Sequence, residues 1–444
     1  MKKEELESQI ESISKEFMKK IEEKDIYVIS HFDTDGITSA AIIIKTLKKL
    51  DKTFSVKILK RIEEGFISTI PKDKIILFLD LGSGNLNEIR ESGLKDVFII
   101  DHHEVIQDIP SNVHIINPEL HNKQKISASG LTYLFSKQVD PENKELAKLA
   151  ILGMIGDSLE KEIGKLNHDI LNDTEITKKR GLLIYPSTRP LNRTLEFCSN
   201  PYIPGVTGNV KGVLELLRET GLKPTNKGYP SLIELKEEEM AKLVTAIMLR
   251  NPKAKNKEII GDIFLLKMFN KLEDAREMSA KINACSKLGE SSVAIQLCME
   301  IPKAIKKAES IHAKYRQRIV SGLKFITENN NLKGNGFEII NARDEIKDTI
   351  IGTLVSILSN SLLYEEGTIL IGMAYYGNKI KVSARSVGKA GRNVREILNT
   401  AIEKTGGEVG GHEFAAGCML KQEKEEEFIK NLKKQLEIEL VKIK

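Results

Sequence analysis

The sequence has no tryptophan, and its aromatic residues are limited to 14 Phe and 9 Tyr among 444 residues. This scarcity argues against a broad surface on which successive bases stack, so any nucleic acid would be bound mainly through its phosphates. Cysteine is scarce as well, and the four present form no CxxC pair, which argues against a disulfide framework and against a zinc knuckle. We expect all four to be buried as small apolar residues: Cys198, Cys285, Cys298 and Cys418.

Long apolar runs and a large excess of one charge are also missing. No run approaches the roughly 18–20 residues needed to cross a bilayer. The first 24 residues alternate lysine and glutamate, unlike a signal peptide. We therefore predict no membrane association and a cytoplasmic location. The formal charge is +5, and 41% of the residues are apolar against 30% charged, which is typical of a soluble globular protein of about two to four domains.

Short apolar runs alternate with helical patterns in the first half of the chain. Continuous runs of four or five apolar residues are typical of strands buried on both faces of a parallel sheet. We therefore predict an α/β fold with a doubly wound parallel sheet, preceded by a helix over residues 3–23. An amphipathic helix is expected from Ala40 to Leu50 and helical structure over residues 129–156. The runs are Ile26–Ser30, Ile75–Leu79, Val97–Ile100 and Val113–Ile116.

Shifts of pattern along the chain predict four parts. Residues 1–195 are expected to form the catalytic domain. Residues 196–300, entered through a loop rich in proline and glycine at 200–208, are expected to form a mostly helical insertion. Residues 301–327 are predicted as one long connecting helix, and residues 328–444 as a smaller α/β C-terminal domain. The C-terminal elements expected are strands at 337–341, 368–374 and 380–384 and helices at 349–358 and 394–404.

Acidic residues and histidines stand where the predicted strands end. In open α/β sheets the site lies at the carboxyl ends of the strands, so we expect these side chains to converge. A single aspartate at a strand end usually forms a turn, and two adjacent histidines usually have no catalytic role. The joint pattern is more informative, because four of the eight histidines fall in these segments or in a glycine-rich one. The residues are Asp33 and Asp35 after the first strand, Asp80 after the next, Asp101, His102 and His103 after the third, and Asp157 after a helix that contains Gly153 and Gly156.

Several uncompensated carboxylates in one cleft would repel one another unless cations neutralised them. Carboxylate oxygens with a single imidazole suit Mn²⁺ or Mg²⁺ better than zinc. Two such ions about 3.5–4 Å apart can clamp a phosphoryl group and activate a water molecule. The pattern therefore predicts a metal-dependent enzyme that hydrolyses phosphoesters.

A second signal lies near the C-terminus, where five glycines surround His412 in the segment Gly406–Gly417. Such a loop lets the backbone approach a ligand closely while the imidazole donates to a phosphate. A tight turn with a surface histidine is an equal alternative. Upstream, Arg385 could bind a phosphate in bidentate fashion. Three further basic residues fit a solvated face as well as a nucleic-acid track: Lys389, Arg392 and Arg395.

Taken together, these motifs resemble the DHH phosphoesterase superfamily, and among its members the archaeal RecJ-like single-strand-specific exonucleases with a GGGH C-terminal domain. One departure is Val409, which stands where that domain usually has its first glycine. The segments that carry the resemblance are His31-Phe-Asp-Thr-Asp-Gly36, Asp80, Asp101-His-His103, Gly153-Met-Ile-Gly-Asp157, Gly410-Gly-His412 and Ala415-Ala-Gly417.

The resemblance implies a role for each of these residues. Asp33 and Asp80 would bind one divalent cation, His31 would complete or support that site, and Asp101 would orient the histidines. His103 would bind the scissile phosphate. The second cation would be held by Asp35, Asp80, His102 and Asp157. The nucleic-acid phosphates would be bound by Arg385, Gly410, Gly411 and His412.

The cofactor implied is a pair of divalent cations, Mn²⁺ foremost and Mg²⁺ as the alternative. The substrate implied is single-stranded DNA or RNA, hydrolysed to 5′-mononucleotides from the 5′ end or from the 3′ end. The processes implied are DNA replication, DNA repair or RNA turnover. Two other functions stay open: a scaffold in a replication or RNA-decay complex, and a phosphodiesterase for oligonucleotides or cyclic dinucleotides. The protein partners implied are GINS, an RNase J-type nuclease or another RecJ-like chain.

Overall fold

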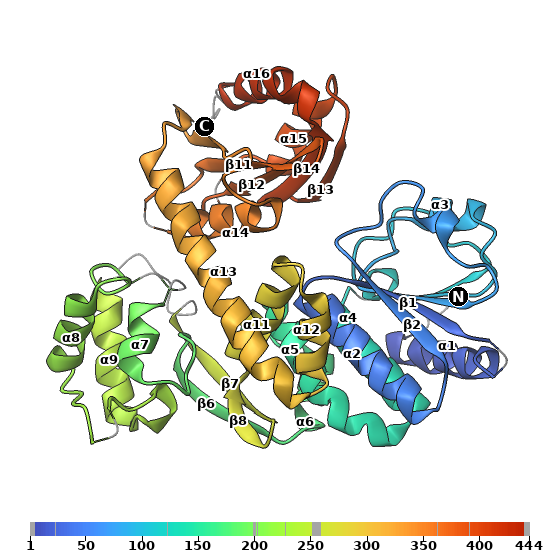
Figure 1. The fold of residues 1–444 in the computed structure, drawn as a ribbon, viewed down its shortest axis with the longest axis horizontal. Helices are drawn as coiled ribbons and strands as arrows, with labels where there is room; N and C mark the ends of the chain where they lie inside the picture. The colour runs from blue at the N-terminus through green and yellow to red at the C-terminus, as the bar shows by residue number, and fades with distance from the viewer. Residues whose placement is uncertain are drawn as a thin grey trace. The chain divides into compact units, whose positions relative to one another are not determined.

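The computed structural model describes residues 5–22, 24–121, 123–198, 201, 203–226, 228–250, 259–361, 363–389 and 391–438. The chain forms two compact units, Met1–His312 and Ala313–Lys444 (Figure 1). None of the helices in the described ranges is long and apolar enough to cross a membrane. The finer predicted division at residues 195, 300 and 327 stays a prediction.

The first unit contains a five-stranded parallel sheet in the order β2-β1-β3-β4-β5. The chain runs outward from β1 to β2 and then returns to β3, so the order reverses between β1 and β3. This is the switch point at which open α/β sheets place their ligands. The predicted parallel α/β fold is confirmed. The strands are β1 (Ile26–His31), β2 (Phe54–Leu59), β3 (Ile75–Leu79), β4 (Val97–Ile100) and β5 (Val113–Ile116).

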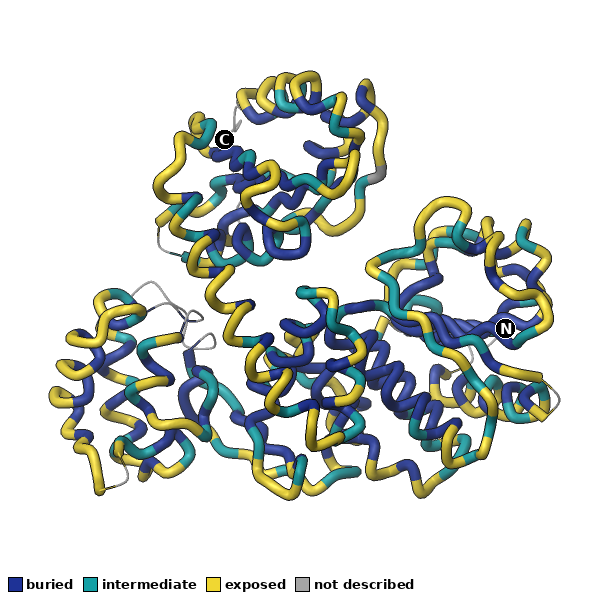
Figure 2. The backbone as a smooth tube through the Cα atoms, viewed as in Figure 1, coloured by how far each residue is buried: buried dark blue, intermediate teal, exposed yellow. Residues whose placement is uncertain are grey.

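The central strands are buried on both faces, as their apolar runs indicate. Every residue of β3 and β4 is buried, and Figure 2 colours the strands of this sheet, near the N-terminus label, mostly dark blue. On one face, Leu77 and Phe98 belong to a core built with the large helices, and on the other, Ile76 and Phe78 pack beside α3. Helices of the first face are α1 (Leu6–Lys20), α2 (Thr34–Lys49), α4 (Ala128–Val139) and α5 (Ala147–Gly156); α3 is Leu86–Glu91.

Helix α2 begins six residues earlier than predicted, within the first acidic motif. Asp33 caps it, because its Oδ1 accepts a hydrogen bond from the backbone N–H of Gly36 at 3.0 Å. The helix is buried nearly all round rather than amphipathic. A second difference concerns residues 129–156, where α4 ends before Pro141 and α5 begins at Ala147, since proline removes a backbone donor and Asp140 caps the following turn.

The predicted insertion, residues 196–300, is less helical than expected, because it supplies two strands, β7 and β8, of a small sheet whose third strand, β6, comes from the residues before it. This antiparallel sheet, in the order β6-β7-β8, stands between the parallel-sheet core and helices α7 to α9, whose hydrophobic core also includes residues of β6 and β7 (Figure 1). Residues 199–200, 202 and 251–258 of this region lie outside the described ranges. The elements here are α6 (Lys165–Asn172), β6 (Ile176–Leu182), α7 (Leu191–Glu196), α8 (Val210–Glu219), α9 (Glu237–Arg250), β7 (Ile260–Met268), β8 (Lys271–Asp274), α11 (Ala275–Lys287) and α12 (Ser291–Cys298).

A single long helix, α13 (Pro302–Glu328), agrees with the connecting helix predicted over 301–327. The second unit is built on a six-stranded sheet in the order β13-β14-β12-β11-β10-β9. The glycine-rich segment that was expected to be a loop forms the hairpin β13/β14 instead. All four cysteines are buried, as predicted. The elements are β9 (Leu332–Gly334), β10 (Phe337–Asn341), α14 (Asp348–Ser359), β11 (Ile369–Tyr376), β12 (Lys379–Ser386), α15 (Val394–Ile402), β13 (Glu408–His412), β14 (Ala415–Lys421) and α16 (Glu425–Leu436).

Candidate metal centre

The predicted site residues of the first unit converge at one edge of the parallel sheet. Asp33 and Asp35 follow β1, Asp80 follows β3, and the two histidines follow β4; these three strands are neighbours in the sheet. Because parallel strands end at the same edge, the side chains meet there. Asp157 joins them from the end of α5. Three overlapping groups have ligand atoms within 4.8 Å of one another: His31, Asp33 and Asp80; Asp80, His102 and His103; and Asp35, His102 and Asp157.

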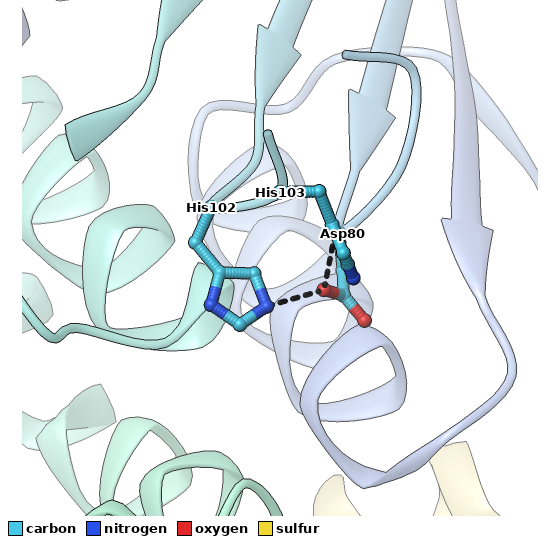
Figure 3. Close-up of side chains that lie close together, drawn as sticks. All are labelled: Asp80, His102 and His103. Atoms are coloured by element: carbon cyan, nitrogen blue, oxygen red, sulfur yellow. Dashed lines mark ion pairs between the residues drawn. The ribbon is translucent and has the colours of Figure 1, made fainter. Parts of the chain in front are cut away.

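Asp80 lies at the centre of this arrangement. Its backbone has φ +58°, in the left-handed region that few residues other than glycine, asparagine and aspartate adopt. Its Oδ2 lies 3.0 Å from Nδ1 of His31. Its Oδ1 lies 3.4 Å from Nε2 of His102 and 3.9 Å from Nδ1 of His103 (Figure 3). Each oxygen of one buried carboxylate therefore faces a different group of potential ligands.

Two carboxylate oxygens in this cluster are buried and have no hydrogen-bond partner among the residues that the structure describes: Oδ1 of Asp80 and Oδ2 of Asp157. Nε2 of His102 lies near both, at 3.4 Å and 3.6 Å, but not in hydrogen-bonding geometry. A buried acceptor without a donor costs free energy, so such oxygens are expected to have a partner. A divalent cation is a suitable one, and the donor set of carboxylates with imidazole fits Mn²⁺ or Mg²⁺.

The carboxylates raise one another's proton affinity. Burial, together with the neighbouring charge of Asp33, raises the pKa of Asp80 to about 6. Burial and the nearby Asp35 raise the pKa of Asp157 well above its usual value. Burial alone would lower the pKa of His102, but Asp80 and the other carboxylates raise it to about 10. Protons on the imidazoles thus balance the carboxylates, and a divalent cation would replace that charge.

Asp101 lies behind the cluster and is fully buried. Its Oδ1 accepts from Nδ1 of His103 at 2.7 Å, and its oxygens also accept backbone N–H bonds from Ser83, His102 and His103. Burial alone would raise the pKa of Asp101, but the bond from His103 and the neighbouring imidazoles hold it below its usual range. The geometry agrees with an orienting role for Asp101.

Asn117 completes the support of this turn, and the sequence analysis did not single it out. Its Nδ2 donates to the hydroxyl of Ser83 at 3.0 Å and to the backbone carbonyl of His103 at 2.9 Å. It is fully buried at the end of β5. The signal in the sequence is the pair Asn117-Pro118, which indicates only that the apolar run Val113–Ile116 ends there.

The predicted phosphate-binding residues of the second unit lie on neighbouring strands. Ala415 of β14 pairs with Arg385 on one side and with His412 on the other, so the three side chains share one face of the sheet. The guanidinium of Arg385 donates to the backbone oxygens of Ala384 and Ala416, and no carboxylate in the described part of the chain pairs with it. Gly410 and Gly411 are exposed beside His412. This face can bind an anion.

Arg392, by contrast, has a structural role. Its guanidinium donates to the backbone oxygens of Gln435, Leu436 and Ile438 at the end of α16. Helix C-termini carry unpaired carbonyls and a partial negative charge, so this contact stabilises the helix end. This contact with the end of α16 was not among the two alternatives left open for Arg392.

Three family models match the chain. The DHH family N-terminal domain matches residues 25–154, the DHH-CID domain matches residues 184–258, and the DHHA1 domain matches residues 336–437. The first match covers the sheet that carries the carboxylates and histidines, apart from Asp157. The third covers Arg385 and the glycine-rich hairpin.

Two relatives match over most of the chain. An uncharacterised protein of Methanocaldococcus jannaschii is 29% identical over 444 residues, which is 96% of each chain. The single-stranded-DNA-specific exonuclease RecJ of Bacillus subtilis is 24% identical over 422 residues, 90% of this chain but only 44% of that protein.

Solved structures share the fold. The crystal structure of exonuclease RecJ bound to manganese has a TM-score of 0.59 at 17% identity, and the match covers 99% of this chain and 96% of that chain. Cdc45 from Entamoeba histolytica has a TM-score of 0.66 at 12% identity, covering 96% of this chain and 99% of that chain. At these identities the likeness is one of fold.

Proposed function

We propose a function for this chain on the premise that it is a RecJ-like member of the DHH superfamily and a phosphoester hydrolase. The proposed activity is that of a metal-dependent exonuclease, which removes 5′-mononucleotides from an end of single-stranded DNA or RNA. The observation that carries the proposal is the convergence of Asp33, Asp35, Asp80 and Asp157 with His102 around two unpartnered carboxylate oxygens. The name of the Bacillus subtilis relative supports the preference for a single strand.

We assign two divalent cations to this site, with Mn²⁺ preferred and Mg²⁺ as the alternative. Asp33 and Asp80 would hold one ion, with His31 beside them; Asp35, Asp80, His102 and Asp157 would hold the other. The two oxygens of Asp80 face the two groups, which supports a bridging role. When bound, such ions would polarise the phosphoryl oxygens and supply an activated water molecule.

His103 is assigned to the scissile phosphate. Its side chain is 58% exposed, while its Nδ1 is bonded to Asp101, so Nε2 is the ring nitrogen that is available to a substrate. Burial alone would lower the pKa of His103, but Asp101 raises it above its usual value. The raised pKa favours the protonated imidazole, in which Nε2 can donate a charge-assisted hydrogen bond to a phosphate oxygen.

Arg385 and His412, with the exposed backbone of Gly410 and Gly411, are assigned to the phosphates of the nucleic acid. Arg385 is partly buried, and within the described ranges its hydrogen-bond partners are backbone carbonyls, which leaves guanidinium donors for a phosphate. Val409 packs against the hydrophobic core of the second unit, so the departure from the GGGH pattern is a core contact rather than a change on the exposed face.

The test is digestion of end-labelled single-stranded DNA and RNA in Mn²⁺, in Mg²⁺ and in EDTA. We expect mononucleotides from one end in the presence of metal. Asp80→Asn should reduce the rate at least about a hundredfold, because it removes an anionic ligand shared by both groups. Asp169→Asn, at an exposed position on α6, is the matched control and should leave the rate unchanged. Full activity of folded Asp80→Asn would refute the proposal.

A role in an assembly is a second candidate, favoured by the likeness of fold to Cdc45. The partners proposed are GINS, an RNase J-type nuclease or another RecJ-like chain, in replication, repair or RNA turnover. Affinity capture with purified candidates, run beside the nuclease assay, separates a scaffold from an active subunit. Substrate length tests the remaining alternative: cleavage confined to oligonucleotides shorter than about ten residues or to cyclic dinucleotides would indicate a small-substrate phosphodiesterase.

A further inference from the structure

The carboxylate of Asp35 is held by backbone groups of another helix. The residue lies in the first turn of α2 and is 1% exposed. Its Oδ2 accepts from the N–H of Ala128 at 2.6 Å, and its Oδ1 accepts from the N–H of Ser129 at 2.9 Å. Both amides belong to the first turn of α4, where helical N–H groups have no partner within the helix. The carboxylate thus has a fixed place between the starts of α2 and α4.

Gly153 of α5 also lies next to the carboxylate of Asp35. Glycine within a helix is less favourable than alanine, and Gly153 does not have the positive φ that would require it. Its packing explains it. A Cβ at this position would lie 2.0 Å from Oγ of Ser129, 2.5 Å from Oδ1 of Asp35 and 2.7 Å from Oγ1 of Thr38. At residue 153, the Cβ of any residue other than glycine would therefore collide with the carboxylate of Asp35.

The same stretch of α5 also positions Asp157. The backbone N–H of Asp157 donates to the carbonyl of Gly153 at 3.0 Å, so the two residues are one helical turn apart. Ligand atoms of Asp35, Asp157 and His102 lie within 4.8 Å of one another. The separation of the two carboxylates thus depends on how closely α5 approaches α2 at residue 153.

We propose that Gly153 is a positioning residue, whose missing Cβ lets α5 approach α2 closely enough for Asp35 and Asp157 to bind the same divalent cation. The inference rests on the proposed function, because it concerns the second of the two metal positions assigned there. None of the three atoms nearest to a Cβ at 153 belongs to His31, Asp33 or Asp80, so the first position is independent of it.

The test is Gly153→Ala in the full chain, with Mn²⁺ binding followed by calorimetry and by electron paramagnetic resonance. The wild-type protein should bind two ions and show a spin-coupled signal. Gly153→Ala should bind one ion with unchanged affinity and the second at least about tenfold more weakly. At Mn²⁺ concentrations that occupy only its tighter position, its spectrum should be that of an isolated ion.

Gly322→Ala is the control for a packing conflict away from the site. A Cβ at residue 322 of α13 would lie 2.5 Å from Cδ1 of Leu354, in the other unit. This variant should lose thermal stability in EDTA but still bind two ions. The comparison separates a general packing defect from a defect in ligand placement.

A further variant covers the case in which Gly153→Ala does not fold. Ser129→Ala removes the hydroxyl nearest to the new methyl group but leaves the conflict with Asp35. The double variant should therefore fold and still bind a single ion with wild-type affinity.

Two ions bound with wild-type affinity, by either Gly153→Ala or the double variant, would overturn the inference. Loss of both ions from a folded variant would also overturn it, because the first position would then depend on residue 153. A wild-type protein that binds no Mn²⁺ would instead refute the proposed function, so the two failures can be told apart.

Discussion

Oδ2 of Asp157 lies 3.6 Å from Nε2 of His102 and has no hydrogen-bond partner in the described part of the chain. Burial and the neighbouring Asp35 raise the pKa of this carboxyl well above its ordinary value, so it lowers the stability of the metal-free fold progressively as the pH rises above about 4. Asp157→Asn removes that charge at nearly constant shape. We expect the melting temperature in EDTA to rise by about 1–3 °C.

The same variant should lose the stabilisation that Mn²⁺ gives to the wild type, because one ligand is gone. Thermal unfolding in EDTA and in Mn²⁺ measures both effects, with Asp169→Asn as the control. A lower melting temperature of Asp157→Asn in EDTA would contradict the prediction.

Metal binding should depend on pH. In the metal-free protein the pKa of His102 is about 10 and that of Asp80 is about 6. At pH 7 a cation must therefore displace the proton on His102, and below pH 6 it must also displace one on Asp80. We expect the apparent Mn²⁺ affinity to rise up to about tenfold per pH unit between pH 6 and 8. Calorimetry in buffers of different ionisation enthalpy should detect the released proton, and a pH-independent affinity would exclude this competition.

Asp101→Asn should separate the orientation of His103 from metal binding. The amide can still contact the ring, but its NH₂ group cannot accept the backbone donors that Asp101 accepts. We expect kcat/KM to fall about 10–100-fold while Mn²⁺ affinity is retained. His103→Gln is the companion variant and should lower activity to a similar degree.

Asp101→Asn should also show a characteristic pH dependence of stability. Because the folded-state pKa of Asp101 is depressed, its contribution is fully present above about pH 4 and is lost as the pH falls further. The difference in melting temperature from the wild type should therefore be largest near pH 7 and shrink in acid. A constant difference from pH 7 to pH 2 would show that ionisation of Asp101 does not contribute.

Two arginines of the second unit should respond differently to substitution by glutamine. Arg385→Gln should weaken binding of a single strand about tenfold and reduce the slope of log K against log salt by about 0.7, as expected for the loss of one phosphate contact. Arg392→Gln should leave the slope unchanged and lower the melting temperature, because Arg392 binds the carbonyls that end α16. Fluorescence anisotropy at several salt concentrations measures both slopes. An unchanged slope for Arg385→Gln would remove this residue from the phosphate-binding face.

The strands that were predicted correctly are those whose environment determines their composition. Residues 75–79 and 97–100 are buried on both faces, so every position is apolar. Strand β2 was missed, because Ser55 and Lys57 are exposed and its apolar residues alternate with them. The hairpin at 408–421 was missed for another reason: its glycines have little strand propensity, and pairing within the sheet determines its conformation.

The convergence of the site residues was predictable, because strands of a parallel sheet end at a common edge and the acidic residues stand at those ends. The contributions of Asn117 and Gly153 were not. Asn117 acts through a bond to a backbone carbonyl from a neighbouring strand, and Gly153 acts through an atom that it lacks. Gly153 stands in one of the motifs that carry the resemblance, Gly153-Met-Ile-Gly-Asp157, but its packing role, like that of Asn117, cannot be recognised before the structure is known.

The left-handed backbone of Asp80 limits how this enzyme can be inactivated by mutation. Only asparagine and glycine tolerate that conformation about as well as aspartate, whereas alanine or valine would add conformational strain to the loss of a ligand. A lineage that kept the architecture but abandoned catalysis should therefore carry Asn or Gly at this site. Sequencing of inactive but well-expressed clones from a randomised codon 80 would reveal this bias.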